Sequence, residues 1–192
     1  MNTSVDKLRT RNLRTVGALA ALFLLPLAMS FWMYYAAEWH PAGRTNHGEL
    51  IQPARPLPLA QWPDAAVLKD KWSLVYIGRG ECVTACRNAL LLMRQTRLSL
   101  NKEMTRVNRV FLAEGNCCDR EFLNREHPGL IVLAASGAPA QALLSNFPTR
   151  DRADSLFVVD PLGNLMMRYD ARDNPKGLLQ DFQKLLKLSH IG

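Results

Sequence analysis

The stretch WSLVYIGRGECVTACRNALLLMRQTRLSL, residues 72–100, carries a strand signature and then a helix signature around two cysteines. Residues 72–77 form a short run rich in β-branched and aromatic residues and ended by a glycine, which predicts a strand. Residues 86–100 are rich in Leu, Met, Arg and Gln and contain neither Gly nor Pro, which predicts a helix. Cys82 and Cys86 therefore lie where a strand passes into a helix.

The remainder of the C-terminal two thirds continues this alternation. Further strands are predicted at residues 109–113, 130–134, 156–160 and 165–169, and further helices at 119–126, 138–144 and 176–188. The last two strands flank the turn sequence PLGN, which predicts a hairpin. Strands that alternate with helices and end in a hairpin predict an α/β fold, with a mixed sheet flanked by helices on both faces.

An apolar segment precedes this region. Residues 15–37 contain no charged residue over 23 positions, and about 20 helical residues cross a hydrocarbon core. Lys7, Arg9, Arg11 and Arg14 lie before the segment, and Trp and Tyr residues crowd its far end. The positive-inside rule then predicts a retained transmembrane helix with a cytoplasmic N-terminus. A cleaved signal peptide is the alternative, but its apolar region is shorter and ends in small residues.

These patterns divide the chain into four predicted segments. We expect a cytoplasmic basic segment at residues 1–14, a transmembrane anchor at 15–37, a Pro-rich arm at 38–61 and a folded domain at 62–192. The stretch 40–63 holds five prolines and no apolar periodicity, which favours a linker. In a bacterial inner membrane this topology places the domain in the periplasm, where disulfides form.

Composition narrows the function further. The chain has 192 residues, a net charge of +7 and 48% hydrophobic residues, which suits one domain of ordinary size with an anchor. No basic stripe interleaved with aromatic residues is present, so we expect no nucleic-acid partner. Four cysteines in this length do not form a disulfide-stapled scaffold, and we expect them to serve chemistry or to fill the core.

Cys82 and Cys86 have three uses at a strand–helix junction. Backbone N–H groups at a helix N-terminus favour a thiolate, so a cysteine there is reactive. In a regular helix the two Cβ atoms would be about 5–6 Å apart, whereas a disulfide needs about 3.5–4.5 Å. Cys82 must therefore lie in the preceding turn if the pair oxidises. The same spacing suits two thiolates around one metal, and two buried thiols without chemistry are the third reading.

Two longer segments extend the pattern. VFLAEGNCCDREFLNREHPGLIVLAA, residues 110–135, and SLFVVDPLGNLMMRYD, residues 155–170, together with the C-x-x-x-C motif behind one N-terminal anchor, resemble the Sco/SenC family over residues 62–188. The resemblance implies a thioredoxin-like fold. It also implies a role in assembling the copper centre of cytochrome c oxidase, as a copper(I) carrier, as a thiol reductase, or as both.

The resemblance breaks at the family's third copper ligand, a histidine in an Asp-His pair before the hairpin. Here Asp151 is followed by Arg152. An arginine stays protonated in a protein and has no lone pair for a metal. The expected site of two sulfurs and one imidazole is therefore incomplete, which favours thiol chemistry or a weakened metal site.

Other histidines and two methionines are candidate donors for the third copper ligand that Arg152 cannot supply. His40 and His47 lie in the arm and His190 lies near the C-terminus, while His127 matches a His-Pro pair of the family and is expected to be structural. Met166 and Met167 are soft donors, but one of two successive strand residues must face the core.

Cys117 and Cys118 form the second departure from the family pattern. They follow the second predicted strand, and loops after neighbouring parallel strands meet at one edge of a sheet. We therefore expect Cys117 or Cys118 to supply the missing copper ligand or a resolving thiol. Two unconnected thiols are the competing reading.

The sequence is compatible with two functions for this protein. The first is a membrane-anchored assembly factor that acts on cytochrome c oxidase subunits, either as a thiol–disulfide oxidoreductase or by copper(I) handling. In the thiol reaction, a more exposed Cys82 attacks and Cys86 resolves the mixed disulfide. The second is a non-catalytic accessory or scaffold of the oxidase complex, because fold similarity alone does not grant activity.

Overall fold

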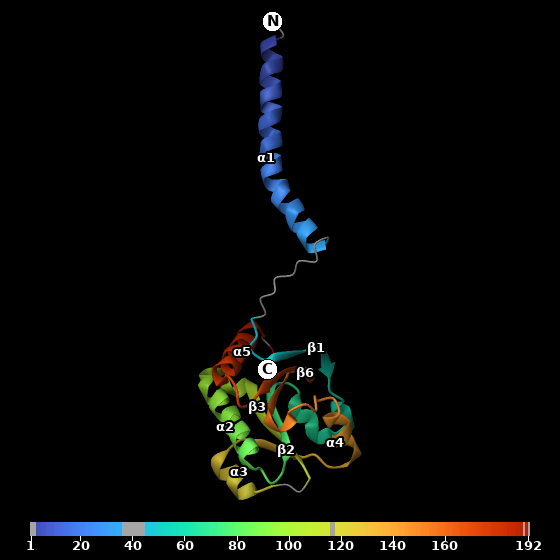
Figure 1. Ribbon diagram of the computed structural model, residues 1–192, viewed down its shortest axis with the longest axis vertical. Helices are drawn as coiled ribbons and strands as arrows, with labels where there is room; N and C mark the ends of the chain where they lie inside the picture. The colour runs from blue at the N-terminus through green and yellow to red at the C-terminus, as the bar shows by residue number, and fades with distance from the viewer. Residues whose placement is uncertain (1–2, 36–44, 116–117, 190, 192) are drawn as a thin grey trace. The chain divides into compact units, whose positions relative to one another are not determined.

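The structure is a computed structural model that describes residues 3–35, 45–115, 118–189 and 191. It divides into two compact units, of which the first ends at Thr45 and the second begins at Asn46. Figure 1 shows a single helix in the first unit and an α/β domain in the second.

The first unit consists of helix α1, Thr3–Tyr35. Its segment Asn12–Tyr35 has a mean hydropathy of 2.0 and none of it is buried, and it is the only helix in the described parts of the chain long and apolar enough to cross a membrane. Pro26 lies inside the helix without ending it, a position that transmembrane helices tolerate. The predicted apolar helix is confirmed, and whether it is retained in a membrane stays a prediction.

The second unit is built on a mixed sheet of six strands. Its order is β1-β6-β5-β2-β3-β4. Strands β2, β3 and β4 are parallel to one another, whereas β5 and β6 form the antiparallel hairpin predicted from PLGN. The strands are β1 (Glu49–Pro56), β2 (Trp72–Arg79), β3 (Val107–Glu114), β4 (Ile131–Ala134), β5 (Ser155–Val159) and β6 (Asn164–Asp170).

Helices cover both faces of this sheet. One face packs against α2 (Thr84–Ser99), α3 (Arg120–Glu126) and α5 (Pro175–Leu188). The other face packs against α4 (Gly137–Leu144) and two short 3-10 helices, η1 (Leu59–Gln61) and η2 (Pro63–Leu68). Two more 3-10 turns, η3 (Asn101–Arg106) and η4 (Arg152–Asp154), precede β3 and β5.

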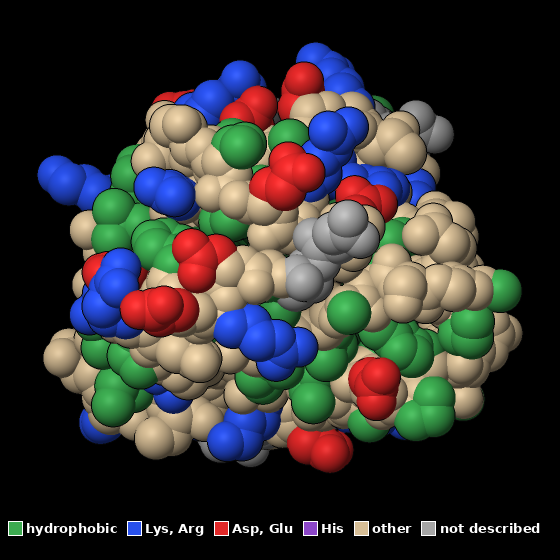
Figure 2. Space-filling model, turned by 90° about the horizontal axis from the view of Figure 1, so that it is seen from below, with side chains coloured by type: hydrophobic (Ala, Val, Ile, Leu, Met, Phe, Trp, Pro, Cys, Tyr) green, Lys and Arg blue, Asp and Glu red, His purple; other side chains and the backbone are tan. Residues whose placement is uncertain are grey.

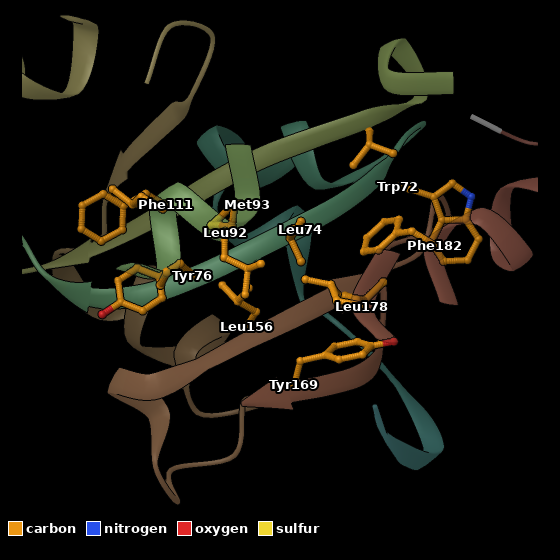
Figure 3. Close-up of a cluster of buried hydrophobic side chains, with 14 of the residues drawn as sticks. Trp72, Leu74, Tyr76, Leu92, Met93, Phe111, Leu156, Tyr169, Leu178 and Phe182 are labelled. Carbon is orange, nitrogen blue, oxygen red and sulfur yellow. The ribbon is translucent and has the colours of Figure 1, made fainter. Parts of the chain in front are cut away.

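Strand β2 lies in the middle of the sheet and is buried from both sides. Trp72, Leu74 and Tyr76 point into the cluster beneath α2 and α5, which Figure 3 shows, while Val75 and Ile77 point toward α4. Complete burial of one such apolar side chain stabilises the fold by about 1.5–3 kcal/mol. This two-sided burial explains why the strand is a continuous apolar run rather than an alternating one.

The predicted Pro-rich arm is corrected by the structure. Residues 46–61 belong to the folded domain, because β1 pairs antiparallel with β6 and Leu57 and Leu59 are buried in the second core cluster. Proline is compatible with β1 because an edge strand leaves some of its N–H groups unpaired. The domain therefore begins at Asn46 rather than near Trp62, and residues 36–44 lie outside the described residues.

Candidate functional site

Cys82 and Cys86 form a disulfide at the junction between β2 and α2, with their Cα atoms 4.9 Å apart. Cys86 is in the first turn of α2, whereas Cys82 precedes the helix and has a left-handed backbone with φ of 44°. The left-handed residue turns the chain before the helix starts. The prediction that Cys82 must leave the helix for the pair to bond is confirmed.

Both half-cystines are buried in the core cluster beneath α2. Cys82 is 3% exposed and Cys86 is 2% exposed. The prediction that Cys82 is the more exposed of the two is not met, because the two exposed fractions differ by only one percentage point. The reason is that the loop folds back onto the sheet, so that both residues pack with Tyr76 and Phe111.

Arg87 connects the disulfide loop to α3. Its Nε donates to the carbonyl of Cys82 at 3.3 Å, and its guanidinium lies 4.8 Å from the ring centre of Phe122 on α3. The Phe122 ring in turn contacts His127 edge-on, with 5.6 Å between ring centres. A continuous chain of contacts therefore runs from the disulfide loop through α3 to a buried histidine.

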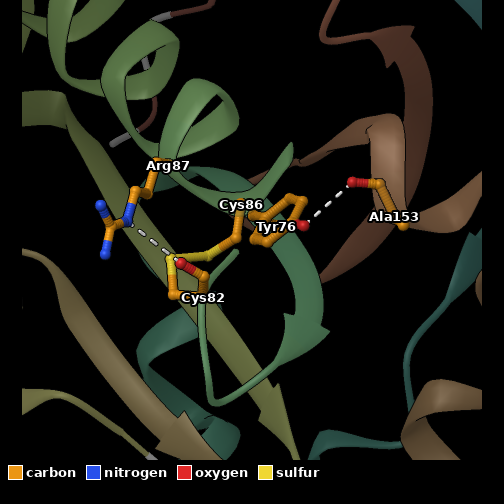
Figure 4. Close-up of a disulfide and its surroundings, with 5 residues drawn as sticks. All are labelled: Tyr76, Cys82, Cys86, Arg87 and Ala153. Atoms are coloured by element: carbon orange, nitrogen blue, oxygen red, sulfur yellow. Dashed lines mark hydrogen bonds between the residues drawn. A yellow bond between two sulfur atoms is a disulfide. The ribbon is translucent and has the colours of Figure 1, made fainter. Parts of the chain in front are cut away.

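Tyr76 lies on the other side of the disulfide. Figure 4 shows its ring beside Cys86 and its hydroxyl directed at Ala153, whose carbonyl it reaches at 2.9 Å. Burial, and secondarily the charge of Asp154, raises the pKa of Tyr76 to about 12, so the hydroxyl remains a donor at neutral pH. A Cβ on Gly78 would lie 2.7 Å from this ring, so the strand needs glycine there.

Arg152 occupies the position where the resembled family has its copper-ligand histidine. The guanidinium donates to the carbonyls of Leu144 at 3.1 Å and Phe147 at 2.9 Å, and it lies 3.8 Å from Glu114. It therefore supports the end of α4 and the loop after it. Within the residues that the structure describes, no three His, Cys, Asp or Glu side chains gather as a metal site would require.

Of the second pair of cysteines, Cys117 and Cys118, the structure describes Cys118. Cys117 lies outside the described residues. Cys118 packs against the same core cluster as the disulfide, and it is itself disulfide-bonded. The hypothesis that Cys117 or Cys118 supplies a ligand or a resolving thiol stays a prediction.

The histidines and methionines have other surroundings. His127 is 4% exposed, and burial, with the charges of Arg109 and Arg94, lowers its pKa, which suits the structural role expected for it. His47 contacts Asp181, while His40 and His190 lie outside the described residues. Met167 is buried in the core as expected.

Two polar clusters were not predicted from the sequence. Asp181, 4% exposed, accepts hydrogen bonds from the Tyr169 hydroxyl at 2.6 Å, from the His47 N–H at 2.7 Å and from the Gly48 N–H at 3.1 Å. Arg109, 3% exposed, donates to the Pro128 carbonyl at 2.6 Å. A lone acid in α5 and a lone arginine in β3 carry no sequence signal of these distant partners.

Between the carboxyl ends of β2 and β3 there is a hollow of about 280 Å³ lined by Arg79, Glu81 and Glu114. Figure 2 shows this end of the domain, where basic, acidic and hydrophobic side chains are interspersed. Neither sign of charge gathers there into one patch.

A mixed sheet covered on both faces, with a disulfide where the central strand meets the first helix after it, defines a thioredoxin-like protein. Residues 72–189 match the family model for the transmembrane-like, thioredoxin-like C-terminal domain, and the chain belongs to this family. A search of curated proteins finds no match.

Solved structures confirm the Sco-like fold. The chain is similar to apo Sco1 from Thermus thermophilus, with 19% identity, a TM-score of 0.55 and coverage of 76% of this chain and 99% of that one. It is also similar to copper-bound yeast Sco1, with 14% identity, a TM-score of 0.54 and coverage of 77% and 96%. A DsbF homologue from Corynebacterium diphtheriae gives 14% identity, a TM-score of 0.50 and coverage of 79% and 97%. At these identities the likeness concerns the fold.

Proposed function

We propose that the chain is a membrane-anchored, Sco-like thiol–disulfide exchange protein that uses Cys82 and Cys86. The observation that carries the proposal is the Cys82–Cys86 bond at the strand–helix junction of a thioredoxin-like domain. A thiolate on this side of the sheet lies at the N-terminus of α2, where the helix dipole stabilises negative charge. Reduction of the pair gives two thiols, and reoxidation returns the bond.

The surroundings of the pair favour thiol chemistry over copper storage. Arg152 is occupied with carbonyl groups and offers no lone pair, so the third ligand implied by the family pattern does not fit here. Copper(I) as a delivered cargo is the second candidate, because it prefers thiolate ligands and the copper-bound yeast Sco1 shares the fold. This chain would offer copper(I) the two sulfurs only after reduction.

The proposed partner is cytochrome c oxidase, at the assembly of its copper centre, as the Sco-like fold suggests. The proposed location is the bacterial inner membrane, with α1 as a single-pass anchor, a basic cytoplasmic N-terminus and the domain in the periplasm. Protease added outside intact spheroplasts should then digest the domain, whereas protection of the domain would contradict the orientation.

The purified full-length chain in detergent micelles tests the chemistry. In a chain that carries Cys117→Ser and Cys118→Ser, we expect the Cys82–Cys86 pair to reduce and reoxidise reversibly across a series of glutathione ratios, and a further Cys82→Ser substitution to abolish this transition. Copper(I) titration of the reduced protein, with and without both Cys117→Ser and Cys118→Ser, measures the second candidate. A pair that never exchanges and a protein that takes up no copper would leave the scaffold reading in place.

A further inference from the structure

His127 is a buried titratable side chain that the proposed thiol reaction does not use. It caps the C-terminal end of α3 and is 4% exposed. Its Nδ1 is buried and has no hydrogen-bond partner among the residues that the structure describes. A proton added to this imidazole would create a charge in a place that water hardly reaches, and the burial of an unpaired charge is costly.

Two arginines bracket His127. Arg94 on α2 donates to the Glu126 carbonyl at 2.8 Å, and Arg109 on β3 donates to the Pro128 carbonyl at 2.6 Å. These carbonyls belong to the residues on either side of His127, so both guanidinium groups lie near it. A positive charge on His127 would therefore be repelled from two directions.

The negative charge near His127 is weaker than this positive charge. The acidic side chain that acts on His127 is the neighbouring Glu126, which is 46% exposed and pairs with Arg125 at 3.0 Å. Arg109 is 3% exposed, and its Nε and Nη1 have no hydrogen-bond partner in the described parts of the chain. The cluster therefore holds excess buried positive charge before His127 takes up any proton.

This environment determines in which state of the domain His127 binds a proton. Burial, together with the charges of Arg109 and Arg94, lowers the pKa of His127 from its ordinary value of about 6.5. The closed domain therefore binds fewer protons than a locally opened state in which the ring meets water. As the pH falls from about 6.5 toward the lowered pKa, the open population rises by up to about tenfold per pH unit.

Opening at His127 reaches the disulfide through three contacts. The His127 ring meets Phe122 edge-on, with 5.6 Å between ring centres, and the Phe122 ring centre lies 4.8 Å from the Arg87 guanidinium. The Arg87 Nε donates to the Cys82 carbonyl at 3.3 Å, as Figure 4 shows. Phe122 lies on α3 and His127 caps it, so displacement of α3 withdraws the ring from Arg87 and loosens the loop that carries Cys82.

We propose that His127 is a proton-operated switch whose protonation releases α3 and exposes the Cys82–Cys86 bond to reductants. The inference rests on the proposed thiol–disulfide function and adds the regulation of that same site. At neutral pH the uncharged ring packs against Phe122 and the disulfide stays buried. In mildly acidic surroundings the protonated ring is stable only in contact with water, so α3 moves away and the disulfide is reached more often.

The experiment measures how fast tris(2-carboxyethyl)phosphine reduces the oxidised full-length chain in detergent micelles at about pH 7.5 and about pH 5.5, on either side of the ordinary histidine pKa. The phosphine takes an oxygen atom from water and becomes a phosphine oxide, while the disulfide is reduced to two thiols. Every protein carries Cys117→Ser and Cys118→Ser, so that only the Cys82–Cys86 pair reacts. His127→Gln is the test variant, because glutamine does not titrate.

The rate of the parent chain divided by the rate of His127→Gln should rise about fivefold to tenfold from the higher pH to the lower. This division removes the pH dependence of the phosphine itself. His47→Gln is the matched control, because the His47 side chain is 40% exposed and contacts Asp181 on α5 rather than α3. It should keep the pH response of the parent chain.

Hydrogen exchange of the parent chain tests the switch without any substitution of His127. After correction for the intrinsic pH dependence of exchange, the protection of the α3 amides should fall about fivefold to tenfold over the same pH range. The amides of α4, which packs on the other face of the sheet, should keep their protection. This measurement decides the question if His127→Gln does not fold.

A rate ratio that is the same at both pH values, or an unchanged protection of α3, would overturn the switch. A reversible transition of the Cys82–Cys86 pair in the glutathione series would then leave the proposed function in place. A pair that shows no such transition would overturn the proposed function instead. The two failures are therefore distinguished by separate measurements on the same protein.

Discussion

Arg152 is a hydrogen-bond donor at a position where the Sco/SenC resemblance implies a copper ligand. Its guanidinium bonds the carbonyls that follow α4, where the last helical C=O groups have no partner within the helix. The side chain is 18% exposed, so these bonds are partly shielded from water. We therefore assign Arg152 a structural role, as the residue that joins α4 to the start of β5.

Replacing Arg152 with alanine should destabilise the domain by about 2–3 kcal/mol, because several charge-assisted hydrogen bonds to carbonyls are lost together. Urea denaturation of the full-length chain measures this loss. Arg150→Ala is the matched control, since Arg150 is 88% exposed and its ion pair is with the half-exposed Asp151, and it should change stability by less than about 0.5 kcal/mol. Equal effects of the two substitutions would contradict the assignment.

Helix α3 is held against the rest of the domain by three arginines. Arg94 donates to the Glu126 carbonyl at 2.8 Å and Arg109 to the Pro128 carbonyl at 2.6 Å, so cations meet the negative end of the helix. Arg87 contacts Phe122 at the other side and reaches the disulfide loop. The position of α3 is therefore coupled to the loop that carries Cys82.

Phe122→Ala should make the disulfide easier to reach. The substitution removes the aromatic ring that the Arg87 guanidinium contacts. If the free energy of local opening falls by about 1.4 kcal/mol, the population of the open state rises about tenfold. The rate of reduction by dithiothreitol measures this change. Glu121→Ala on the same helix serves as the control, because the Glu121 side chain is 91% exposed. Identical rates in the two variants would show that α3 does not control access.

Most of the domain's elements could be predicted from local pattern. The predicted strands at 72–77 and 109–113 appear as β2 and β3, longer by two and three residues respectively. They were predictable because central strands buried on both faces are continuous apolar runs. Strand β1 was missed because it contains two prolines, which favour a linker, and a single buried residue, Ile51. Its pairing with β6 depends on residues more than 100 positions away, which no local pattern encodes.

The site was predictable in part. The position of Cys82 before the helix follows from disulfide geometry, and the failure of the third ligand follows from the identity of Arg152. Burial of the disulfide could not be predicted, because it depends on how the loop packs onto Tyr76 and on where α3 lies.

The domain's first residues are fixed to its last helix through Asp181. This carboxylate receives the backbone N–H groups of His47 and Gly48 and the hydroxyl of Tyr169, and the His47 Nδ1 lies 3.0 Å from its second oxygen. Burial alone would raise the pKa of Asp181, but these hydrogen bonds outweigh burial and lower it. The chain that follows the N-terminal unit thus enters the domain at a defined point.

Asp181→Asn should destabilise the domain by about 2–4 kcal/mol at neutral pH, because buried donors lose a charged acceptor. A carboxyl whose pKa is lowered on folding contributes stability above its unfolded value of about 3.9, and this contribution is lost as the pH falls through the folded value. The gap between wild type and variant should therefore narrow below about pH 4. Denaturation across pH measures it, with the exposed Asp173→Asn as control. A gap that is constant from pH 7 to pH 3 would contradict the role of the charge.

The bonds of Arg152 also constrain how this chain can change over time. A histidine in place of Arg152 would take the donor from the Leu144 and Phe147 carbonyls in the same step that supplies an imidazole. Gain of a metal-binding side chain is thus coupled to loss of stability. An engineer who wants that ligand here must therefore also provide α4 with another way to end.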